Sequence, residues 1–141
     1  MPASVLKVVI DTNIVFEGLT KQGNASGLVI DAWKSELLHV CVSNALAYEY
    51  ADVLSRKLSE DRWQRIRPVL GNLLTKAEFI VAYFSWRPAT PDPADEHSID
   101  CAMNANAVIV TFNARDFRNA QKTLGLRVIT PLELLVELAR S

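Results

Sequence analysis

The stretch VLKVVIDTN, residues 5–13, decides the fold class of this chain, because a short apolar run in it ends abruptly at three polar residues. Residues 5–10 are rich in β-branched side chains and are apolar at every position except Lys7. A strand that is apolar throughout is typical of a parallel sheet covered on both faces, whereas a half-exposed strand alternates. We therefore expect a buried parallel strand that ends at Asp11, Thr12 and Asn13.

Comparable runs recur along the chain, separated by longer segments with helical spacing. Further strands are expected over 37–42, 79–84, 107–111 and 126–130. Helices are expected over 25–35, 44–58, 62–76, from Pro93 to about 106, over 114–124 and over 131–140, with Ser43, Asp61 and Asp92 as N-caps. This alternation predicts a three-layer α/β/α fold with a central parallel five-stranded sheet, formed by residues 1–141 as a single domain.

Composition excludes several classes of protein. With 50% hydrophobic and 22% charged residues, the chain is globular rather than disordered. Its formal charge of -1 argues against coating nucleic acid through bulk positive charge, so any such contact must be local. We find no signal segment and no run near the roughly 18 apolar residues of a membrane helix, which predicts a soluble, cytoplasmic protein without a membrane partner.

The two cysteines, Cys41 and Cys101, form no CxxC motif and have no nearby His at metal-ligand spacing, which predicts buried free thiols.

Four acidic residues follow strands or face the expected cleft, where parallel sheets bind their ligands. Asp11 follows the first strand, and Glu49 lies on the apolar stripe of the helix after the second. Asp95 is placed on the inward face of its helix with Ile99, Ala102, Met103 and Asn106, while Glu96 and Asp92 point outward. Asp116 follows the fourth strand in TFNARDF, after Thr111 and Asn113. The first and fourth strands are neighbours in the commonest doubly wound orders, which brings these acids toward one cleft.

Each acid also has a local explanation that stays open. Asp11 is explained by a turn or a helix N-cap, and Glu49 by a side chain that reaches solvent at the edge of the stripe. Asp95 is explained by the helix dipole, and Asp116 by the first turn of the next helix. Asp52 is expected to be solvated.

Four carboxylates in one cleft require neutralisation. At about 6 Å and an effective dielectric near 20, each pair repels by about 3 kcal/mol. Either some of the acids are protonated or divalent cations bind them. Oxygen ligands suit Mg²⁺ or Mn²⁺, which activate a bound water and stabilise charge on a phosphoryl group. The pattern therefore favours metal-dependent phosphodiester hydrolysis without a protein nucleophile.

At these residues the sequence resembles the PIN-domain family, in particular its VapC-like toxin branch. The resemblance is carried by VVIDTNIVFEGL, VSNALAYEYADVL, DPADEHSIDCAMNANAVIVTFNARDF and VITPLELL, which together cover nearly the whole chain. It implies a Rossmann-like sheet, metal-dependent endoribonuclease or related nuclease activity, a cognate antitoxin and homodimerisation. Asp11, Glu49, Asp95 and Asp116 match the family's four acids, and Asn13 and Thr111 match residues that support them, beside Thr12 and Asn113. Many relatives carry Asp where this chain has Asn113. If Asp116 cannot reach the metals, a second metal position is therefore weakened. The first metal position, built on Asp11, Glu49 and Asp95, would survive.

RNA contacts are expected on a local basic patch. Its members are Arg56, Lys57, Arg62, Arg65 and Arg67, with Arg87 beside Trp86 as a further contact that could stack a base. A solvated helix face is the default explanation of the patch. Trp33, Trp63 and Trp86 are read as packing residues, His39 as structural, and His97 as facing away from the cleft.

Two other functions compete with a nuclease. In a haloacid-dehalogenase-like phosphatase a strand-end Asp is the nucleophile, but the acid expected two residues later is Asn13 here, which cannot transfer a proton. A catalytically silent module would bind metal or RNA without cutting. A dinucleotide-binding domain is disfavoured, because the chain has no GxGxxG and no P-loop.

Overall fold

The computed structural model of the chain describes residues 6–21, 23–81 and 96–140. Five parallel strands form one sheet in the order β3-β2-β1-β4-β5, which confirms the predicted α/β class. The strands are β1 (Lys7–Ile10), β2 (His39–Val42), β3 (Glu78–Phe79), β4 (Val108–Val110) and β5 (Val128–Ile129). The helices are α1 (Thr12–Thr20), α2 (Ala25–Lys34), α3 (Asn44–Lys57), α4 (Glu60–Thr75), α5 (Glu96–Ala105), the 3-10 turn η2 (Ala114–Phe117), α6 (Arg118–Leu124) and α7 (Pro131–Arg140).

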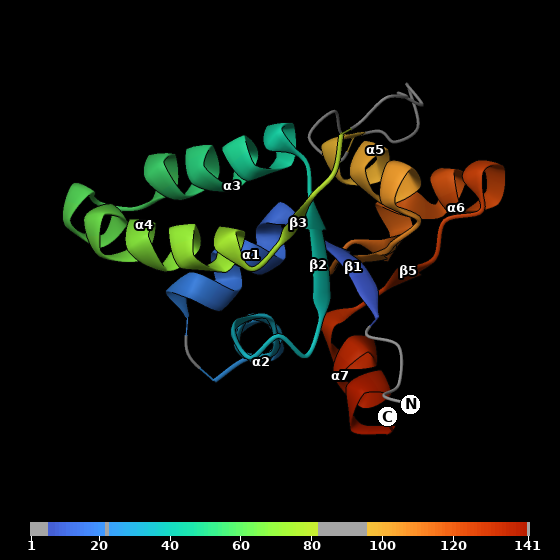
Figure 1. The fold of residues 1–141 in the computed structure, drawn as a ribbon, viewed down its shortest axis with the longest axis horizontal. Helices are drawn as coiled ribbons and strands as arrows, with labels where there is room; N and C mark the ends of the chain where they lie inside the picture. Colours follow the sequence, from blue (N-terminus) through green and yellow to red (C-terminus); the bar gives the residue numbers. More distant parts are fainter. Residues whose placement is uncertain (1–5, 22, 82–95, 141) are drawn as a thin grey trace.

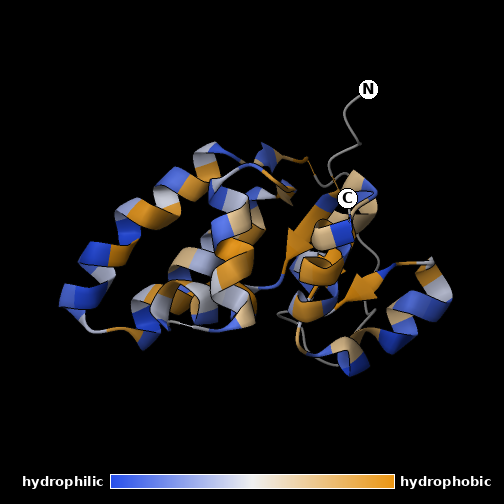
Figure 2. Cartoon of the chain, turned by 90° about the horizontal axis from the view of Figure 1, so that it is seen from below, coloured by the Kyte–Doolittle hydropathy of each residue, from blue (hydrophilic) through white to orange (hydrophobic). Residues whose placement is uncertain are grey.

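Helices cover both faces of the sheet. Figure 1 shows α1 to α4 gathered on one side and α5 and α6 on the other. The helix α7 packs against α2, and α5 packs against β1, β2 and β4. Apart from the polar first residues of β1, β2 and β3, the strands are hydrophobic, while the helices are striped, as Figure 2 shows. The buried apolar residues of the strands belong to the core.

The sheet register aligns the ends of the three central strands. β1 lies between β2 and β4, with Val8 opposite Val40 and Ile10 opposite Val110. The amide of Asp11 continues this ladder by donating to the carbonyl of Val110 at 3.0 Å. The expectation that the first and fourth strands are neighbours is therefore confirmed. Asp11 and Thr111, which follow these two strands, therefore lie at the same end of the sheet, where the carboxyl ends of the strands meet.

Some predicted boundaries are wrong. The helix predicted to start after Asp61 starts at Glu60, because the side chain of Ser59 accepts the amide of Arg62 and caps it. The single helix predicted over 114–124 is a 3-10 turn followed by α6. The third strand spans only Glu78–Phe79 among described residues, and part of its predicted range lies outside them.

The helix α1 had no counterpart among the predicted helices. It begins directly after β1, and Asp11 is its N-cap. Its buried residues, Thr12, Ile14 and Val15, lie in its first turn, so it lacks the long apolar stripe that identifies a helix in a sequence. None of the described helices combines the length and apolarity that a membrane span requires.

Candidate active site

Asp11 is the centre of the candidate site. Its side chain is buried, with 3% of the residue exposed, at the carboxyl end of β1. One carboxylate oxygen accepts the amide of Thr12 at 2.9 Å and lies 3.5 Å from the hydroxyl of Ser98, and the other accepts the hydroxyl of Thr111 at 2.8 Å. These contacts hold both oxygens in fixed directions. The capping role expected as the local explanation of Asp11 is therefore real and coexists with its place at the sheet edge.

Glu49 reaches the carboxyl end of β1 from α3. The hydroxyl of Thr12 donates to the Oε2 atom of Glu49, and the phenol of the next residue, Tyr50, donates to the carbonyl of Ile10. Two consecutive residues of α3 thus contact the residues on either side of Asp11. Complete burial raises the pKa of Tyr50 well above its usual value, with Cys101, Asp11 and Glu49 adding to the effect, so the phenol stays protonated and able to donate.

Thr111 links β4 to the site. Its hydroxyl donates to Asp11 and accepts the backbone amide of Asn113 at 3.0 Å, so Asn113 supports the site through its backbone. Asp116 follows in η2, where its amide donates to the carbonyl of Asn113 at 2.9 Å and its side chain is half-buried. Asn13 is exposed in the first turn of α1. Among the described residues, Asp11, Glu49 and Asp116 do not bring three carboxylate oxygens all within 4.8 Å of one another.

The helix α5 differs from its prediction. Glu96 was expected to point outward, and this is wrong, because the residue is only 4% exposed. Asp100 is also buried, whereas Asn106, predicted on the inward face, is exposed and has a positive φ of 54° at the end of the helix. The cause is packing on several sides: α5 contacts β1, β2, β4 and α3, so it lacks a single solvated face.

Ser98 was missed by the sequence analysis, although a signal was present. It shares a helical stripe with Cys101, Ala102 and Ala105, all of them buried, and this stripe points to the sheet.

Four residues named in the predictions lie outside the described residues: Asp95, Asp92, Arg87 and Trp86.

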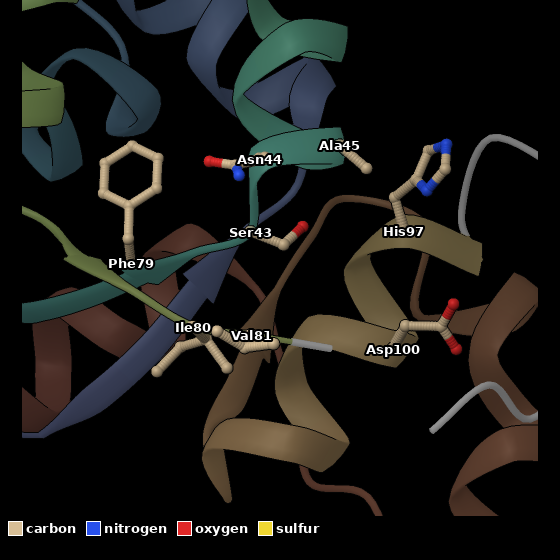
Figure 3. A pocket seen from close by; sticks show the side chains of 8 residues that line it. All are labelled: Ser43, Asn44, Ala45, Phe79, Ile80, Val81, His97 and Asp100. Atoms are coloured by element: carbon tan, nitrogen blue, oxygen red, sulfur yellow. The ribbon is translucent and has the colours of Figure 1, made fainter. Parts of the chain in front are cut away.

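A pocket of about 340 Å³ opens at the carboxyl ends of β2 and β3. Figure 3 shows its walls, formed by Ser43 to Ala45 at the start of α3, by Phe79 to Val81, and by His97 and Asp100 of α5. His97 was expected to face away, but it lines this pocket. Phe79, a residue that is 48% exposed, belongs to an apolar wall opposite polar side chains. Such a pocket can accept a flat group with hydrogen-bonding edges.

The five basic residues of the predicted patch are exposed on the end of α3 and on α4. Three of them make contacts within the chain. Arg56 pairs with Asp52 at 3.0 Å, Lys57 lies 5.0 Å from the centre of the Phe16 ring, and Arg62 donates to the carbonyl of Thr20 at 3.0 Å.

Lys57 contacts Phe16 and Arg62 contacts Thr20, as Glu49 contacts Thr12, so these two cations and Glu49 lie along one face of α1. We call this face, formed by Thr12, Phe16 and Thr20, the seam of α1.

Trp33 is fully buried and Trp63 packs against the core, as expected of packing residues.

Carboxylates are the ligands that the site offers to a cation. Asp11 and Glu49 supply hard oxygen atoms of the kind that Mg²⁺ and Mn²⁺ prefer. Both side chains are oriented by hydroxyl donors, and carboxylates held in this way are suited to metal binding. The described part of the site therefore fits a divalent cation bound at the sheet edge.

Comparison with known proteins agrees with this architecture. The family model described as PIN domain matches residues 7–115. No curated protein sequence matches the chain.

Several solved structures share the fold at low sequence identity. The crystal structure of VapBC2 from Rickettsia felis, bound to a DNA fragment from its promoter, is similar with a TM-score of 0.62 and 14% identity, over 89% of this chain and 98% of that one. VapBC-1 from nontypeable Haemophilus influenzae gives a TM-score of 0.62 at 14% identity, over 90% and 99%. FitAcB from Neisseria gonorrhoeae gives 0.61 at 15%, over 89% and 98%.

Proposed function

The chain belongs to the PIN domain family, and we propose that it is a divalent-metal-dependent endoribonuclease. The observation that carries this proposal is the fixed position of Asp11, whose two carboxylate oxygens are held by Thr12, Thr111 and Ser98 beside Glu49. Such rigid, oriented carboxylates at the carboxyl ends of parallel strands suit a metal centre better than a purely structural role.

In this proposal Asp11 and Glu49 hold Mg²⁺ or Mn²⁺, with Asp95 as the third acid and Asp116 as the fourth. The bound cation would lower the pKa of a water molecule and stabilise negative charge on the scissile phosphate. Thr12 orients Glu49, and Thr111 and Ser98 orient Asp11. Asn13 and Asn113 lie next to these residues and support the site.

The substrate assigned to the site is single-stranded RNA. The pocket lined by Phe79 and His97 would accept a base next to the scissile bond, by stacking on the exposed ring. The basic residues of the α1 seam would contact phosphates farther along the strand. A local cluster of this kind is needed because the whole chain has a formal charge of -1.

We further propose that the protein is the toxin component of a type II toxin-antitoxin pair, acting in the cytoplasm as a homodimer with a cognate antitoxin. The support is the likeness in fold to VapBC and FitAcB structures. A short neighbouring reading frame, encoding a DNA-binding start and a tail able to enter the cleft, is the expected genomic companion.

Cleavage by acid variants tests the nuclease. Purified Asp11→Asn and Glu49→Gln proteins, assayed on labelled RNA and single-stranded DNA with and without Mn²⁺, should lose about 100-fold or more of the wild-type activity, because loss of a ligand costs at least what loss of an orienting partner does. Asn at position 11 can still cap α1, so the fold should persist. Asp52→Asn is the matched control, because Asp52 lies on the same helix as Glu49 and pairs with Arg56.

Two results would overturn this assignment. Wild-type cleavage by Asp11→Asn, after contaminating nucleases are excluded, would show that the acid site is not responsible. If Mn²⁺ instead raised the melting temperature of the wild-type protein without any cleavage of RNA or DNA, the silent binding module would replace the nuclease.

A further inference from the structure

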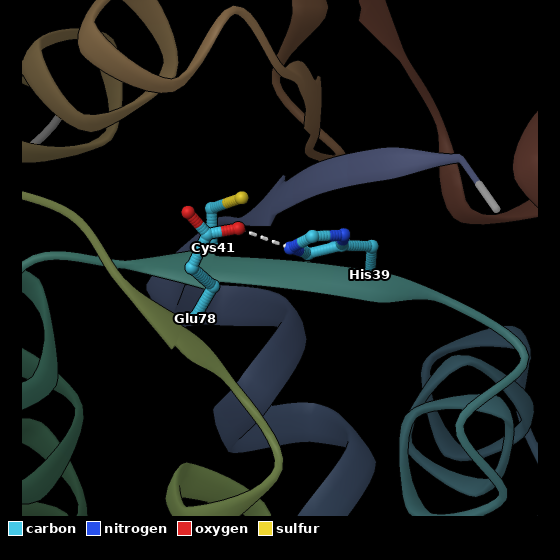
Figure 4. Close-up of side chains that lie close together, drawn as sticks. All are labelled: His39, Cys41 and Glu78. Carbon is cyan, nitrogen blue, oxygen red and sulfur yellow. Dashed lines mark hydrogen bonds and ion pairs between the residues drawn. The ribbon is translucent and has the colours of Figure 1, made fainter. Parts of the chain in front are cut away.

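A second group of ligand atoms lies on β2 and on β3, which is the outermost strand on that side of the sheet. The side chains of His39, Cys41 and Glu78 each place one nitrogen, sulfur or oxygen atom within 4.8 Å of the other two. His39 and Cys41 are two residues apart on β2 and therefore share a face, and Glu78 is the partner of Cys41 on β3. Figure 4 shows the three side chains together on this face. The prediction that no His accompanies the cysteines is therefore wrong for Cys41.

The chemistry of these atoms differs from that of the acid site. Thiolate sulfur, imidazole nitrogen and carboxylate oxygen are the three ligand types that Zn²⁺ uses, whereas Mg²⁺ prefers oxygen alone. A thiolate and a carboxylate together carry two negative charges, which balance the charge of one Zn²⁺ ion. The set therefore selects a soft or borderline transition metal over the cation expected at Asp11.

The position of the group also suits a bound ion. Cys41 is buried, while the side chains of His39 and Glu78 are 37% and 45% exposed, so an ion can enter from solvent with the sulfur at the inner end. The ring of His39 and the carboxylate of Glu78 already contact each other through a hydrogen bond. Two of the three ligands are thus held near one another before a metal arrives, which lowers the cost of ordering them.

We propose that His39, Cys41 and Glu78 bind one Zn²⁺ ion, with water at the fourth position. On binding, the Cys41 thiol releases its proton to solvent and its sulfur becomes a ligand, as do an imidazole nitrogen of His39 and a carboxylate oxygen of Glu78. The ion bridges β2 and β3 and fastens the short edge strand, which has two residues, to the sheet. The site shares no residue with the proposed nuclease centre and stands without it.

Cobalt spectroscopy on the full-length chain tests this site. After chelator treatment under reducing conditions, the protein is titrated with Co²⁺, whose bond to a thiolate gives a charge-transfer absorption that carboxylate ligands cannot produce. We expect this band at one Co²⁺ per chain, and its loss on addition of one equivalent of Zn²⁺. Because the signal needs sulfur, metal at the Asp11 site does not contribute, and failure of either proposal is recognisable by itself.

Four variants identify the ligands. Cys41→Ser should abolish the band, whereas Cys101→Ser, which changes the other buried free thiol, should retain it. His39→Asn and Glu78→Gln change half-exposed side chains and should keep the fold, and each should weaken Co²⁺ binding at least tenfold, since even partners that only orient ligands cost 10–100-fold. Absence of a thiolate band in the wild type would overturn the proposal. So would a band that survives Cys41→Ser, or unchanged affinity in both the His39 and Glu78 variants.

Discussion

The single hydroxyl group of Thr111 connects the end of β4 with the candidate site. It donates to Asp11 at 2.8 Å and accepts the amide of Asn113 at 3.0 Å. Thr111→Val should lower the free energy of unfolding by about 1–3 kcal/mol, because it leaves a buried carboxylate oxygen without this donor. It should also reduce Mn²⁺-dependent RNA cleavage, because Asp11 is then less firmly oriented. Urea denaturation and the cleavage assay measure the two effects.

Thr111→Ser is the matched control for this prediction, since it keeps the hydroxyl and should retain most of the stability and activity. A Val variant as stable and as active as the wild type would show that the hydroxyl is dispensable. The same would follow if the Ser variant lost as much as the Val variant, because the methyl group would then be responsible.

Individual residues of the site were predictable where a strand end marked them. Asp11 and Thr111 follow apolar runs directly, and the structure joins them by a hydrogen bond. Glu96 was misplaced because a helix in contact with several elements has no single solvated face from which to infer orientation. The cluster of His39, Cys41 and Glu78 was invisible, because its third member comes from another strand and pairing register cannot be read from spacing along one chain.

Packing between α1 and α2 makes Gly18 sensitive to substitution. A Cβ atom at Gly18 would lie 2.7 Å from the backbone oxygen of Ser26 and would clash with the side chain of Ile30. Gly18→Ala should therefore destabilise the protein by about 1–2 kcal/mol, since the overlap outweighs the gain of about 1 kcal/mol in helix propensity. Urea denaturation measures the difference.

Gly71 provides the opposite case within another helix. A Cβ atom there meets nothing within 4 Å, and the residue is exposed on α4. Gly71→Ala should stabilise the protein by about 0.5–1 kcal/mol, through helix propensity and a less flexible unfolded chain. If both alanine variants changed stability in the same direction, close packing of α1 on α2 would not be the cause of the Gly18 effect.

Helices and strands can be predicted from the sequence where their buried apolar residues recur at a regular spacing. The central strands are buried at nearly every position, so their apolar runs predicted them, and Pro131–Arg140 was predicted at its observed bounds. The start of α4 was ambiguous because Ser59 and Asp61 are both good caps, and only the structure shows that Ser59 accepts the amide of Arg62. With Ser59 as the cap, Asp61 lies in the first turn, where the helix dipole stabilises its charge.

The stability of the whole molecule should depend on alkaline pH through its buried acidic groups, which are two thiols and the phenol of Tyr50. Burial raises the pKa of Cys41 to about 11, with a further increase from Glu78, and burial likewise raises the pKa of Cys101 to about 12. Both groups have an ordinary pKa of 9.0, so the unfolded chain loses these protons first as the pH rises. The resulting stabilisation is complete below the ordinary value and is lost progressively as the pH rises toward the folded values.

Urea midpoints of metal-free protein, measured from neutral pH upward, should therefore stay level until the ordinary thiol pKa of 9.0 is approached and then fall. The urea midpoint of Cys101→Ala should fall less steeply over the alkaline range, because the ionisation of Cys101 is removed and its effect on the pKa of Tyr50 is lost with it. A wild-type midpoint that is constant through this range, or a Cys101→Ala profile as steep as the wild type, would contradict the assignment of the effect to these groups.

Binding of RNA should depend on charge near one end of the molecule rather than on its total charge. In the Asp11→Asn background, where we expect RNA to be bound but not cut, replacing Lys57 and Arg62 by Gln removes two cations from the seam of α1 that also contacts Glu49. Each phosphate contact on a single strand contributes about 0.7 to the slope of log Kd against log salt, so the slope should fall by about 1.4. Affinity at low salt should fall with it.

Lys34 and Lys76 are the matched pair for this test, because both precede strands and so lie at the opposite edge of the sheet from Asp11 and Thr111. Replacing them by Gln changes the net charge by the same amount and should leave the salt slope unchanged. Filter binding of labelled RNA across a salt series separates the cases. Equal losses from both pairs would mean that RNA responds only to total charge, and a loss confined to Lys34 and Lys76 would place the RNA at the wrong end of the sheet for cleavage at Asp11.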